Sequence, residues 1–178
     1  MLEIRIHGLG GQGVVTMSEI LAMACFEARF EVQVFPWFGP ERTGAPVTGF
    51  IRLDDKAIRL RSQIYLPDII VVTDEKLLTK IDVAEGAKKI TRLVINSALP
   101  CAELSKKIKL NPKQIICYNA STSDKRLSNS VMLGFVAKQF NLASLDNCLK
   151  AVKTKFKDKE ALVVKANLEA VTKGYAGK

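Results

Sequence analysis

The sequence has few of the side chains that usually carry out acid–base, nucleophilic or metal chemistry. Its 178 residues include one histidine, and its four cysteines form no CxxC pair. No nucleophile–base pair, metal-spaced His/Cys cluster or Walker lysine can be assembled from the residues present. We therefore expect no catalytic residue and no metal site, and we expect His7, at a strand end beside glycines, to be a satisfied structural imidazole rather than a general base.

Long hydrophobic stretches are also missing. The longest unbroken apolar run, Ile20 to Phe26, is far shorter than the roughly 20 residues that cross a bilayer, and Glu3 and Arg5 lie directly before the first glycines. The scattered cysteines are typical of free thiols in a reducing cytoplasm. The sequence therefore predicts a cytoplasmic protein with no signal peptide, membrane span or membrane partner.

The net charge of +9 comes from the second half of the chain. Residues 1–80 have nine Lys and Arg against ten Asp and Glu, whereas residues 81–178 have 18 against eight. A basic surface can attract nucleic acid, phosphorylated small molecules or acidic proteins, or it can be a solvated lysine-rich face. The interleaved aromatic residues of a platform for single-stranded nucleic acid are missing, so we expect no nucleic-acid partner.

The pattern of the chain predicts a single α/β domain over residues 1–178. The length and the 48% hydrophobic content suit one core, and no repeat or linker marks a boundary. Short β-branched runs alternate with helical patterns, which is typical of a mostly parallel sheet with covering helices. The expected strands are residues 2–7, 32–35, 47–53, 68–73, 92–96 and 114–119.

Four segments have the apolar spacing of helices. They are residues 14–29, residues 128–140, residues 146–153 and a last helix from about residue 159. Gly134 is expected to allow close approach of a neighbouring element, and Gly174 is expected to end the last helix.

A glycine-rich turn, GLGGQG at residues 8–13, joins the first strand to the first helix. It fits the spacing G-x-G-x-x-G in the strand–turn–helix context that this pattern requires. Glycines permit a tight turn, expose backbone N–H groups and aim the positive end of a helix at an anion. The candidate ligand-binding residues here are Gly8, Gly10, Gly11, Gln12 and Gly13.

Three interpretations of this turn remain open. A dinucleotide site also needs an Asp or Glu at the end of the second strand, but residues 36–40 contain no acid, and Glu27 and Glu31 come too early. This disfavours a nicotinamide or flavin. A different phosphate-bearing ligand, or glycines that only pack the helix on the sheet, are the alternatives.

A second unusual stretch, FPWFGPERTGAP at residues 35–46, has three aromatics, three prolines and two glycines. We expect a rigid apolar loop that forms an interaction surface. The alternative is that Phe35, Trp37 and Phe38 fill the core while Glu41 and Arg42 pair with each other. Arg42 could instead bind a phosphate or the carboxylate of a partner.

Four stretches in order along nearly the whole chain resemble the γ subunit of the 2-oxoacid:ferredoxin oxidoreductases, the family that includes pyruvate synthase. They are IRIHGLGGQGVVTMSEILA, FPWFGPERTGAPVTGFIR, NSVMLGF and NLEAVTKGY. The first two are specific, because a GxGGQG turn followed by a GPERxGAPV stretch is not a general α/β pattern. The resemblance implies a Rossmann-like three-layer domain with a mostly parallel sheet and helices on both faces.

The resemblance also implies a role in anaerobic metabolism. Such an enzyme decarboxylates a 2-oxoacid on thiamine diphosphate, passes electrons through iron–sulfur clusters to ferredoxin and delivers the acyl group to coenzyme A. Thiamine diphosphate, Mg and the clusters are expected in the alpha, beta and delta partner subunits. This chain, inactive alone, would assist assembly and contact coenzyme A.

The positions that match the family motifs are the expected coenzyme A contacts. They are Gly8, Gly10, Gly11, Gln12 and Gly13 in the first turn, and Gly39, Pro40, Glu41, Arg42 and Gly44 in the second stretch. Pyruvate is the expected substrate, with 2-oxoisovalerate or another 2-oxoacid as the alternative. The competing class is a free-standing Rossmann-type nucleotide-binding module.

Overall fold

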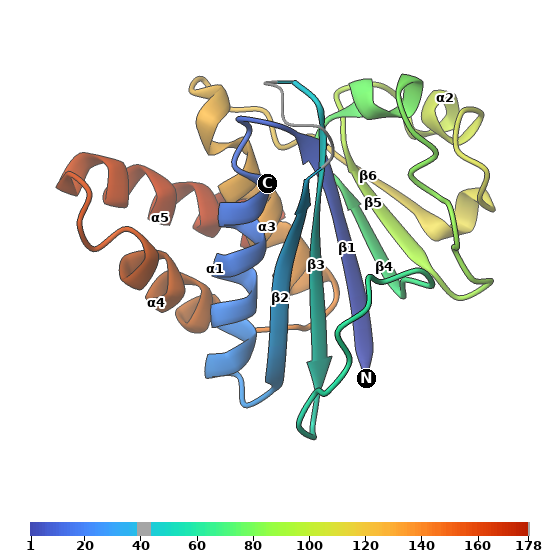
Figure 1. Cartoon of the computed structure of the whole chain (residues 1–178). Coiled ribbons are helices and arrows are strands. Elements are labelled where there is room, and N and C mark those ends of the chain that lie inside the picture. The colour runs from blue at the N-terminus through green and yellow to red at the C-terminus, as the bar shows by residue number, and fades with distance from the viewer. Residues whose placement is uncertain (39–43, 178) are drawn as a thin grey trace.

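The computed structural model describes residues 1–38 and 44–177 and is built around one six-stranded sheet (Figure 1). The strand order is β2-β3-β1-β4-β5-β6. The strands are β1 (Leu2–Leu9), β2 (Glu31–Phe38), β3 (Pro46–Asp54), β4 (Ile69–Val72), β5 (Arg92–Asn96) and β6 (Ile115–Tyr118). Within the described part of the chain, β3 is the one strand that runs opposite to the other five. The predicted mostly parallel sheet is therefore confirmed.

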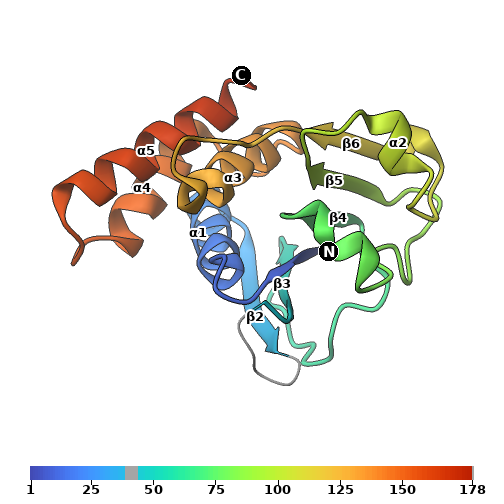
Figure 2. The same ribbon diagram turned by 90° about the horizontal axis from the view of Figure 1, so that it is seen from above.

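One face of the sheet is covered by long helices, as Figures 1 and 2 show from two directions. These helices are α1 (Val14–Glu27), α3 (Ser128–Gln139), α4 (Leu145–Lys155) and α5 (Ala161–Tyr175). All four lie where the apolar spacing predicts them, because each buries an apolar stripe against the sheet or a neighbouring helix.

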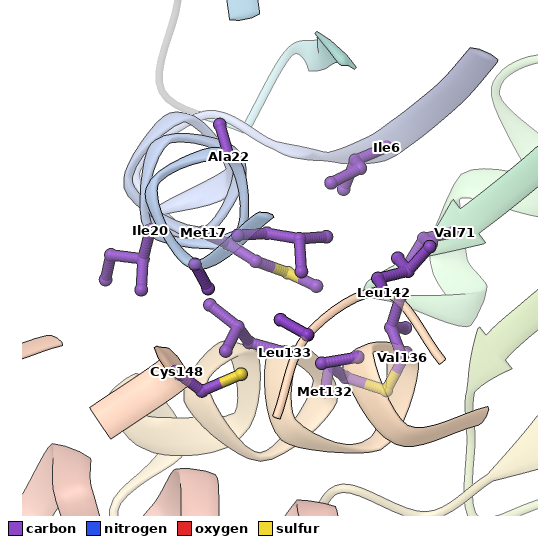
Figure 3. Close-up of a cluster of buried hydrophobic side chains, with 14 of the residues drawn as sticks. Ile6, Met17, Ile20, Ala22, Val71, Met132, Leu133, Val136, Leu142 and Cys148 are labelled. Atoms are coloured by element: carbon purple, nitrogen blue, oxygen red, sulfur yellow. The ribbon is translucent and has the colours of Figure 1, made fainter. Parts of the chain in front are cut away.

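The main core lies between this helical layer and the sheet (Figure 3). In the close-up, side chains from α1, α3 and the sheet converge on one apolar volume without a polar atom among them. The labelled members are Ile6, Met17, Ile20, Ala22, Val71, Met132, Leu133, Val136, Leu142 and Cys148. Burial of this apolar surface is the main stabilising contribution to the fold.

The opposite face is covered by shorter elements. They are η1 (Glu75–Thr79), α2 (Cys101–Ser105), η2 (Pro112–Gln114) and irregular chain, while η3 (Lys125–Leu127) leads into α3. A second apolar cluster lies there and includes Ile70, Val72, Leu77, Leu93, Ile95 and Leu104. Helices therefore flank both faces as expected, but the helical stretches predicted between β4, β5 and β6 shrink to single turns. The segment from residue 81 to 91 fills its share of the face as turns, with Gly86 at φ 70°.

The aromatic stretch at residues 35–38 is strand rather than loop, so the expectation of a loop from Phe35 is wrong. Pro36 stands opposite Gly49 in the ladder, and β2 tolerates proline because it is an edge strand. Phe35 packs on Phe50 with 5.1 Å between ring centroids, whereas Trp37 is 53% exposed. Phe35 is therefore half-buried against Phe50 at the border of the core, and the core alternative fails for Trp37.

Glycines at one helix crossing confirm one expectation and correct another. A Cβ on Gly134 would lie 2.1 Å from the carbonyl oxygen of Val171, so this glycine does permit close approach of α5. Gly174 does not end α5; a Cβ there would lie 1.9 Å from the carbonyl oxygen of Val131. Gly177, at φ 72°, follows the end of the helix instead.

The cysteines divide into two pairs. Cys25 and Cys148 are free and buried in the main core, as expected. Cys101 and Cys117 form a disulfide with 5.5 Å between their Cα atoms. The expectation of four free thiols is therefore wrong, because the fold brings α2 against β6 and a separation of 16 residues gives no local sign of this contact.

Candidate ligand-binding cleft

A cleft of about 1040 Å³ opens at the carboxyl ends of β1, β4, β5 and β6. From β1 the chain passes through α1 to one side of the sheet, while β4 continues the sheet on the other side. Open α/β sheets bind ligands at such a reversal of strand order. The cleft is therefore the strongest candidate for a ligand site in the described part of the chain.

The glycine turn forms one wall of this cleft, although its glycines play different parts. Gly8 belongs to β1, and a Cβ there would lie 2.1 Å from Val14 Cγ2 and 2.5 Å from Thr73 Oγ1. Gly11 and Gly13 line the cleft with φ of 85° and 80°. Gly8 thus packs the start of α1 on the sheet, while Gly11 and Gly13 supply a left-handed backbone that other residues rarely adopt.

The N-terminus of α1 opens into the cleft. Among the residues that the structure describes, no side chain caps this helix, and Gly13 occupies the N-cap position. The first N–H groups of an α-helix have no partner within the helix, and together with the helix dipole they favour an anion. The geometry suits a phosphate or another anionic group beside Gly13.

The two stretches singled out in the sequence meet at this wall. The Gly10 N–H donates to the Ala45 carbonyl over 2.8 Å, and the Gly44 N–H donates to the Gly10 carbonyl over 3.3 Å. Lys80 Nζ also donates to the Gly44 carbonyl over 3.0 Å. Of the other candidates, Gly39, Pro40, Glu41 and Arg42 lie outside the described residues.

Gln12 is held on three sides. Its Oε1 accepts from the Leu9 N–H over 3.1 Å, and its Nε2 donates to Asp74 Oδ2 over 2.8 Å. Its carbonyl accepts from Nδ2 of Asn129, the second residue of α3, over 2.6 Å. The turn is therefore fixed to β4 and to the helical layer before any ligand arrives.

Several cleft residues were missed by the sequence interpretation. Asp74 and Asn96 lie at the ends of β4 and β5, and Asn96 joins two strand ends by donating to the Thr73 carbonyl and accepting from the Ala120 N–H. Thr73 is 4% exposed, and its Oγ1 has no hydrogen-bond partner within the described residues. The signal was available, because polar residues directly after parallel strands gather at one edge of the sheet.

The charges around the cleft balance. Its wall includes the cations Lys76, Lys125 and Arg126 and the acids Asp74, Glu75 and Asp124. Arg126 hydrogen-bonds Asp124 and lowers the pKa of that carboxyl. Among residues 1–38 and 44–177, Lys76 and Lys125 take part in no ion pair, and neither do Asp74 and Glu75, so the N-terminus of α1 is the feature that attracts an anion here.

His7 lies beneath the turn and is buried, as expected. Burial and the neighbouring Arg5 lower its pKa to about 3. Its Nδ1 lies 3.3 Å from Thr48 Oγ1, while its Nε2 has no partner in the described part of the chain. The imidazole is neutral near pH 7 and only half satisfied, which corrects the expectation of a fully satisfied ring.

The order of the strands separates the end of β2, where a dinucleotide site has its Asp or Glu, from the glycine turn after β1. That acid works when the second strand lies beside the first. Here β3 pairs with β1 along its whole length, and β2 lies one strand further out. The end of β2 therefore lies beside β3, one strand away from the glycine turn that follows β1.

A glycine-rich strand–turn–helix at the head of a mostly parallel sheet defines a Rossmann-like α/β domain. The family model described as pyruvate ferredoxin/flavodoxin oxidoreductase matches residues 3–177. The gamma subunit common to the pyruvate and ketoisovalerate oxidoreductases of Pyrococcus abyssi is 42% identical over 161 residues, with 88% of this chain and 87% of that protein covered. Pyruvate synthase subunit PorC of Methanothermobacter thermautotrophicus is 40% identical, with 98% and 94% covered.

Solved structures agree. The pyruvate oxidoreductase subunit PORC of Thermotoga maritima superposes with a TM-score of 0.81 at 31% identity, over 98% of this chain and 95% of that one. A 2-oxoglutarate:ferredoxin oxidoreductase from Magnetococcus marinus, with 2-oxoglutarate, coenzyme A and succinyl-CoA bound, gives a TM-score of 0.74 at 25% identity. That match covers 99% of this chain and 30% of the other. The chain therefore belongs to the pyruvate ferredoxin/flavodoxin oxidoreductase family, as a subunit of the gamma or PorC type.

Two further findings concern residues 1–38 and 44–177. No helix there is both long enough and apolar enough to cross a membrane. No group of three or more His, Cys, Asp or Glu residues within these ranges could hold a metal ion.

Proposed function

We propose that this chain is the gamma subunit of a cytoplasmic pyruvate:ferredoxin oxidoreductase and that its cleft binds part of coenzyme A. The observation that carries the proposal is the uncapped N-terminus of α1 opening into a large cleft between Gly13 and two lysines, Lys76 and Lys125. Coenzyme A is a polyanion, and phosphate groups are well suited to a helix N-terminus. When bound, coenzyme A supplies the thiol that accepts the acyl group.

Residues of this chain would bind and orient the cofactor rather than react with it. Gly11 and Gly13 give the backbone the shape that presents N–H groups, and Gln12 is fixed by Asp74 and Asn129 so that the turn keeps this shape. Gly8, Gly10 and Gly44 hold the wall together, and Gly39, Pro40, Glu41 and Arg42 are proposed to complete it. Preorganisation of this kind lowers the entropic cost of binding.

A second part of the proposal is a structural role in the assembly. Exposed apolar side chains gather where α1 meets the free edge of the sheet, with Phe26 63% and Val34 37% exposed. Beside them α1, α4 and β2 enclose a groove of about 430 Å³ lined by Met23, Phe26 and Val34. Contiguous apolar surface of this kind favours a subunit contact, and the partners we propose are the alpha, beta and delta subunits, with ferredoxin reached through the complex.

The experiment is a kinetic comparison of two glycine variants in the purified complex. Gly13→Ala places a Cβ at a φ of 80° in the cleft wall, whereas Gly177→Ala does so at a φ of 72° near the C-terminus. We expect Gly13→Ala to raise the KM for coenzyme A about tenfold, equivalent to about 1.4 kcal/mol, without changing the KM for pyruvate. An unchanged KM for coenzyme A in an intact complex would refute the ligand assignment, and equal effects of both variants would show general destabilisation.

The alternative 2-oxoacids are tested with the same complex. The specificity constant for pyruvate should exceed those for 2-oxoisovalerate and 2-oxoglutarate. A preference for either of the latter would replace pyruvate while leaving the cofactor assignment intact.

A further inference from the structure

The Cys101–Cys117 disulfide lies next to one wall of the cleft. Cys101 is the first residue of α2, and Cys117 lies in the middle of β6. Only residues 97–100 separate Cys101 from the end of β5, and two of them, Ser97 and Ala98, line the cleft. The disulfide therefore anchors the segment that forms the β5 side of the cleft to the neighbouring strand.

Apart from the disulfide, this segment is held by a few polar contacts at its start. The Ser97 N–H donates to the Tyr118 carbonyl over 3.1 Å, and Ser97 Oγ contacts the Glu75 carboxylate and accepts from the Leu99 N–H. The segment from residue 106 to 113 that follows α2 is mostly exposed, although Ile108 is buried. Within α2 itself, Leu104 is the buried residue. Opening the bond would leave residues 97–105 attached by these contacts and by the buried side chain of Leu104 in α2.

The other two cysteines provide an internal contrast. Cys25 and Cys148 are both fully buried, and burial raises the pKa of their thiols to about 12 and about 11. Such thiols are inert, because the thiolate is the reactive form and reagents must reach it. Cys101 lies on the outer helix α2 and Cys117 on the edge strand β6, and both residues are only partly buried, so they are less shielded from a small thiol or disulfide than Cys25 and Cys148.

We propose that Cys101 and Cys117 form a reversible thiol–disulfide pair that fixes or releases the β5–α2 wall of the cleft according to the redox state of the surrounding thiols. In the oxidising direction the two thiols react with one low-molecular-weight disulfide. One cysteine thiolate attacks it and expels a free thiol, and the second cysteine thiolate then attacks the mixed disulfide and expels another. The two cysteine sulfurs are oxidised, the added disulfide is reduced to two thiols, and reduction runs the same exchange backwards.

The consequence is a cleft wall whose order depends on thiol redox state. With the bond closed, the 16-residue separation between the two cysteines is constrained and the wall keeps one position. With the bond open, local opening of residues 97–105 becomes more frequent, as in segments with few buried contacts. The inference stands on the disulfide and its position, so it does not depend on coenzyme A being the ligand.

The test uses the full chain equilibrated in buffers that range from reduced to oxidised glutathione. Trapping of free thiols and mass spectrometry then count thiols at each cysteine, and hydrogen exchange is followed in the same samples. We expect Cys101 and Cys117 to pass together from two thiols to none, while Cys25 and Cys148 stay unreactive. Exchange in residues 97–110 should be at least tenfold faster in the reduced chain, and exchange in α1 should not change.

The Cys117→Ser variant is the matched control, and its exchange should stay at the fast level in every buffer. If that variant fails to fold, the wild-type titration decides alone. A bond that stays closed, or thiols that stay free, across the whole series would overturn the proposal. Equal exchange of residues 97–110 in the two states would also overturn it, because the bond would then not control the wall.

Discussion

The two faces of the sheet are stabilised in different ways. The face under α1, α3, α4 and α5 is an apolar core, in which strand residues such as Ile4, Ile6 and Val71 meet helix side chains. The opposite face of the same strands buries Arg5, His7 and Arg52. Along β1 the two sets alternate, because successive side chains of a strand point to opposite faces.

The comparison shows that the burial of apolar area alone does not account for the stability of this fold. On the helical face the stabilisation follows apolar area and close packing, which have no strong directional requirement. On the opposite face each buried cation needs particular acceptors. Arg5 Nη2 donates to the carbonyls of Val83 and Glu85 over 3.2 and 2.5 Å, so the irregular chain there is fixed by hydrogen bonds in addition to the apolar packing of Val83.

The largest effect is expected for Arg52→Ala. Arg52 is 1% exposed, and it donates to Glu3 Oε1 over 2.9 Å and to Gln33 Oε1 over 2.8 Å. Removing one partner of a buried ion pair leaves the others unpaired, so we expect a loss of about 4 kcal/mol in the free energy of unfolding. Urea denaturation measures it, with Arg92→Ala, at an exposed position of β5, as the control. A loss below about 1 kcal/mol would mean that the polar face does not depend on its buried cation.

The helical face is tested by Gly174→Ala. The new Cβ would approach the Val131 carbonyl oxygen to 1.9 Å, and backbone cannot move aside as a side chain can. We expect α3 and α5 to separate and the free energy of unfolding to fall by about 3 kcal/mol. The control is Gly177→Ala, which has a φ of 72° and no atom within 4 Å of its Cβ, and should cost about 1 kcal/mol. Equal losses would show that the crossing of α3 and α5 tolerates a Cβ, so close packing would not be the reason for Gly174.

The helical face was also the part of the fold that the sequence predicted well. The apolar spacing places α1, α3, α4 and α5 within a few residues of their observed bounds, because each helix presents a continuous stripe to the core. The strand order was not predictable in the same way. β2 and β3 have similar local patterns, and nothing local to either shows that β3 lies between β1 and β2.

The candidate site was predicted in part for the same reason. The glycine turn carries a local pattern with a backbone requirement, and Gly11 and Gly13 meet it with positive φ. Asp74, Asn96 and Asn129 come from segments far apart in the sequence, and they meet only through the sheet order and the packing of α3. Asp74 and Asn96 could have been found from their places at or directly after the ends of expected strands, but the contact of Asn129 with the turn and the Cys101–Cys117 disulfide depend on tertiary packing and leave no local signal.

The burial of His7 on the polar face predicts how the free energy of unfolding depends on pH. The pKa of His7 is lowered to about 3, so below pH 6.5 the unfolded chain takes up a proton that the folded chain refuses. Stability is therefore complete above pH 6.5 and falls by about 1.4 kcal/mol per pH unit as the pH drops towards 3. Urea denaturation of the wild-type chain at pH 6.5 and 5 should show this fall of about 2 kcal/mol, and the His7→Gln variant should lack it. Since His7 is the single histidine, NMR can follow it, and a ring signal that titrates near pH 6.5 would contradict a buried neutral imidazole.

The smallest effect is expected at Asn129, because this residue contributes both to the packed helical layer and to a directed hydrogen bond. Asn129 belongs to the helical layer, yet its Nδ2 makes a directed hydrogen bond of 2.6 Å to the Gln12 carbonyl in the glycine turn. We expect Asn129→Ala to cost about 1 kcal/mol and to speed hydrogen exchange of residues 10–16 about fivefold, while Gln139→Ala, exposed on the same helix, changes neither. If Asn129→Ala leaves exchange unchanged, the turn is held by its bonds to Ala45, Gly44, Leu9 and Asp74, and the helical layer supports the cleft only by packing.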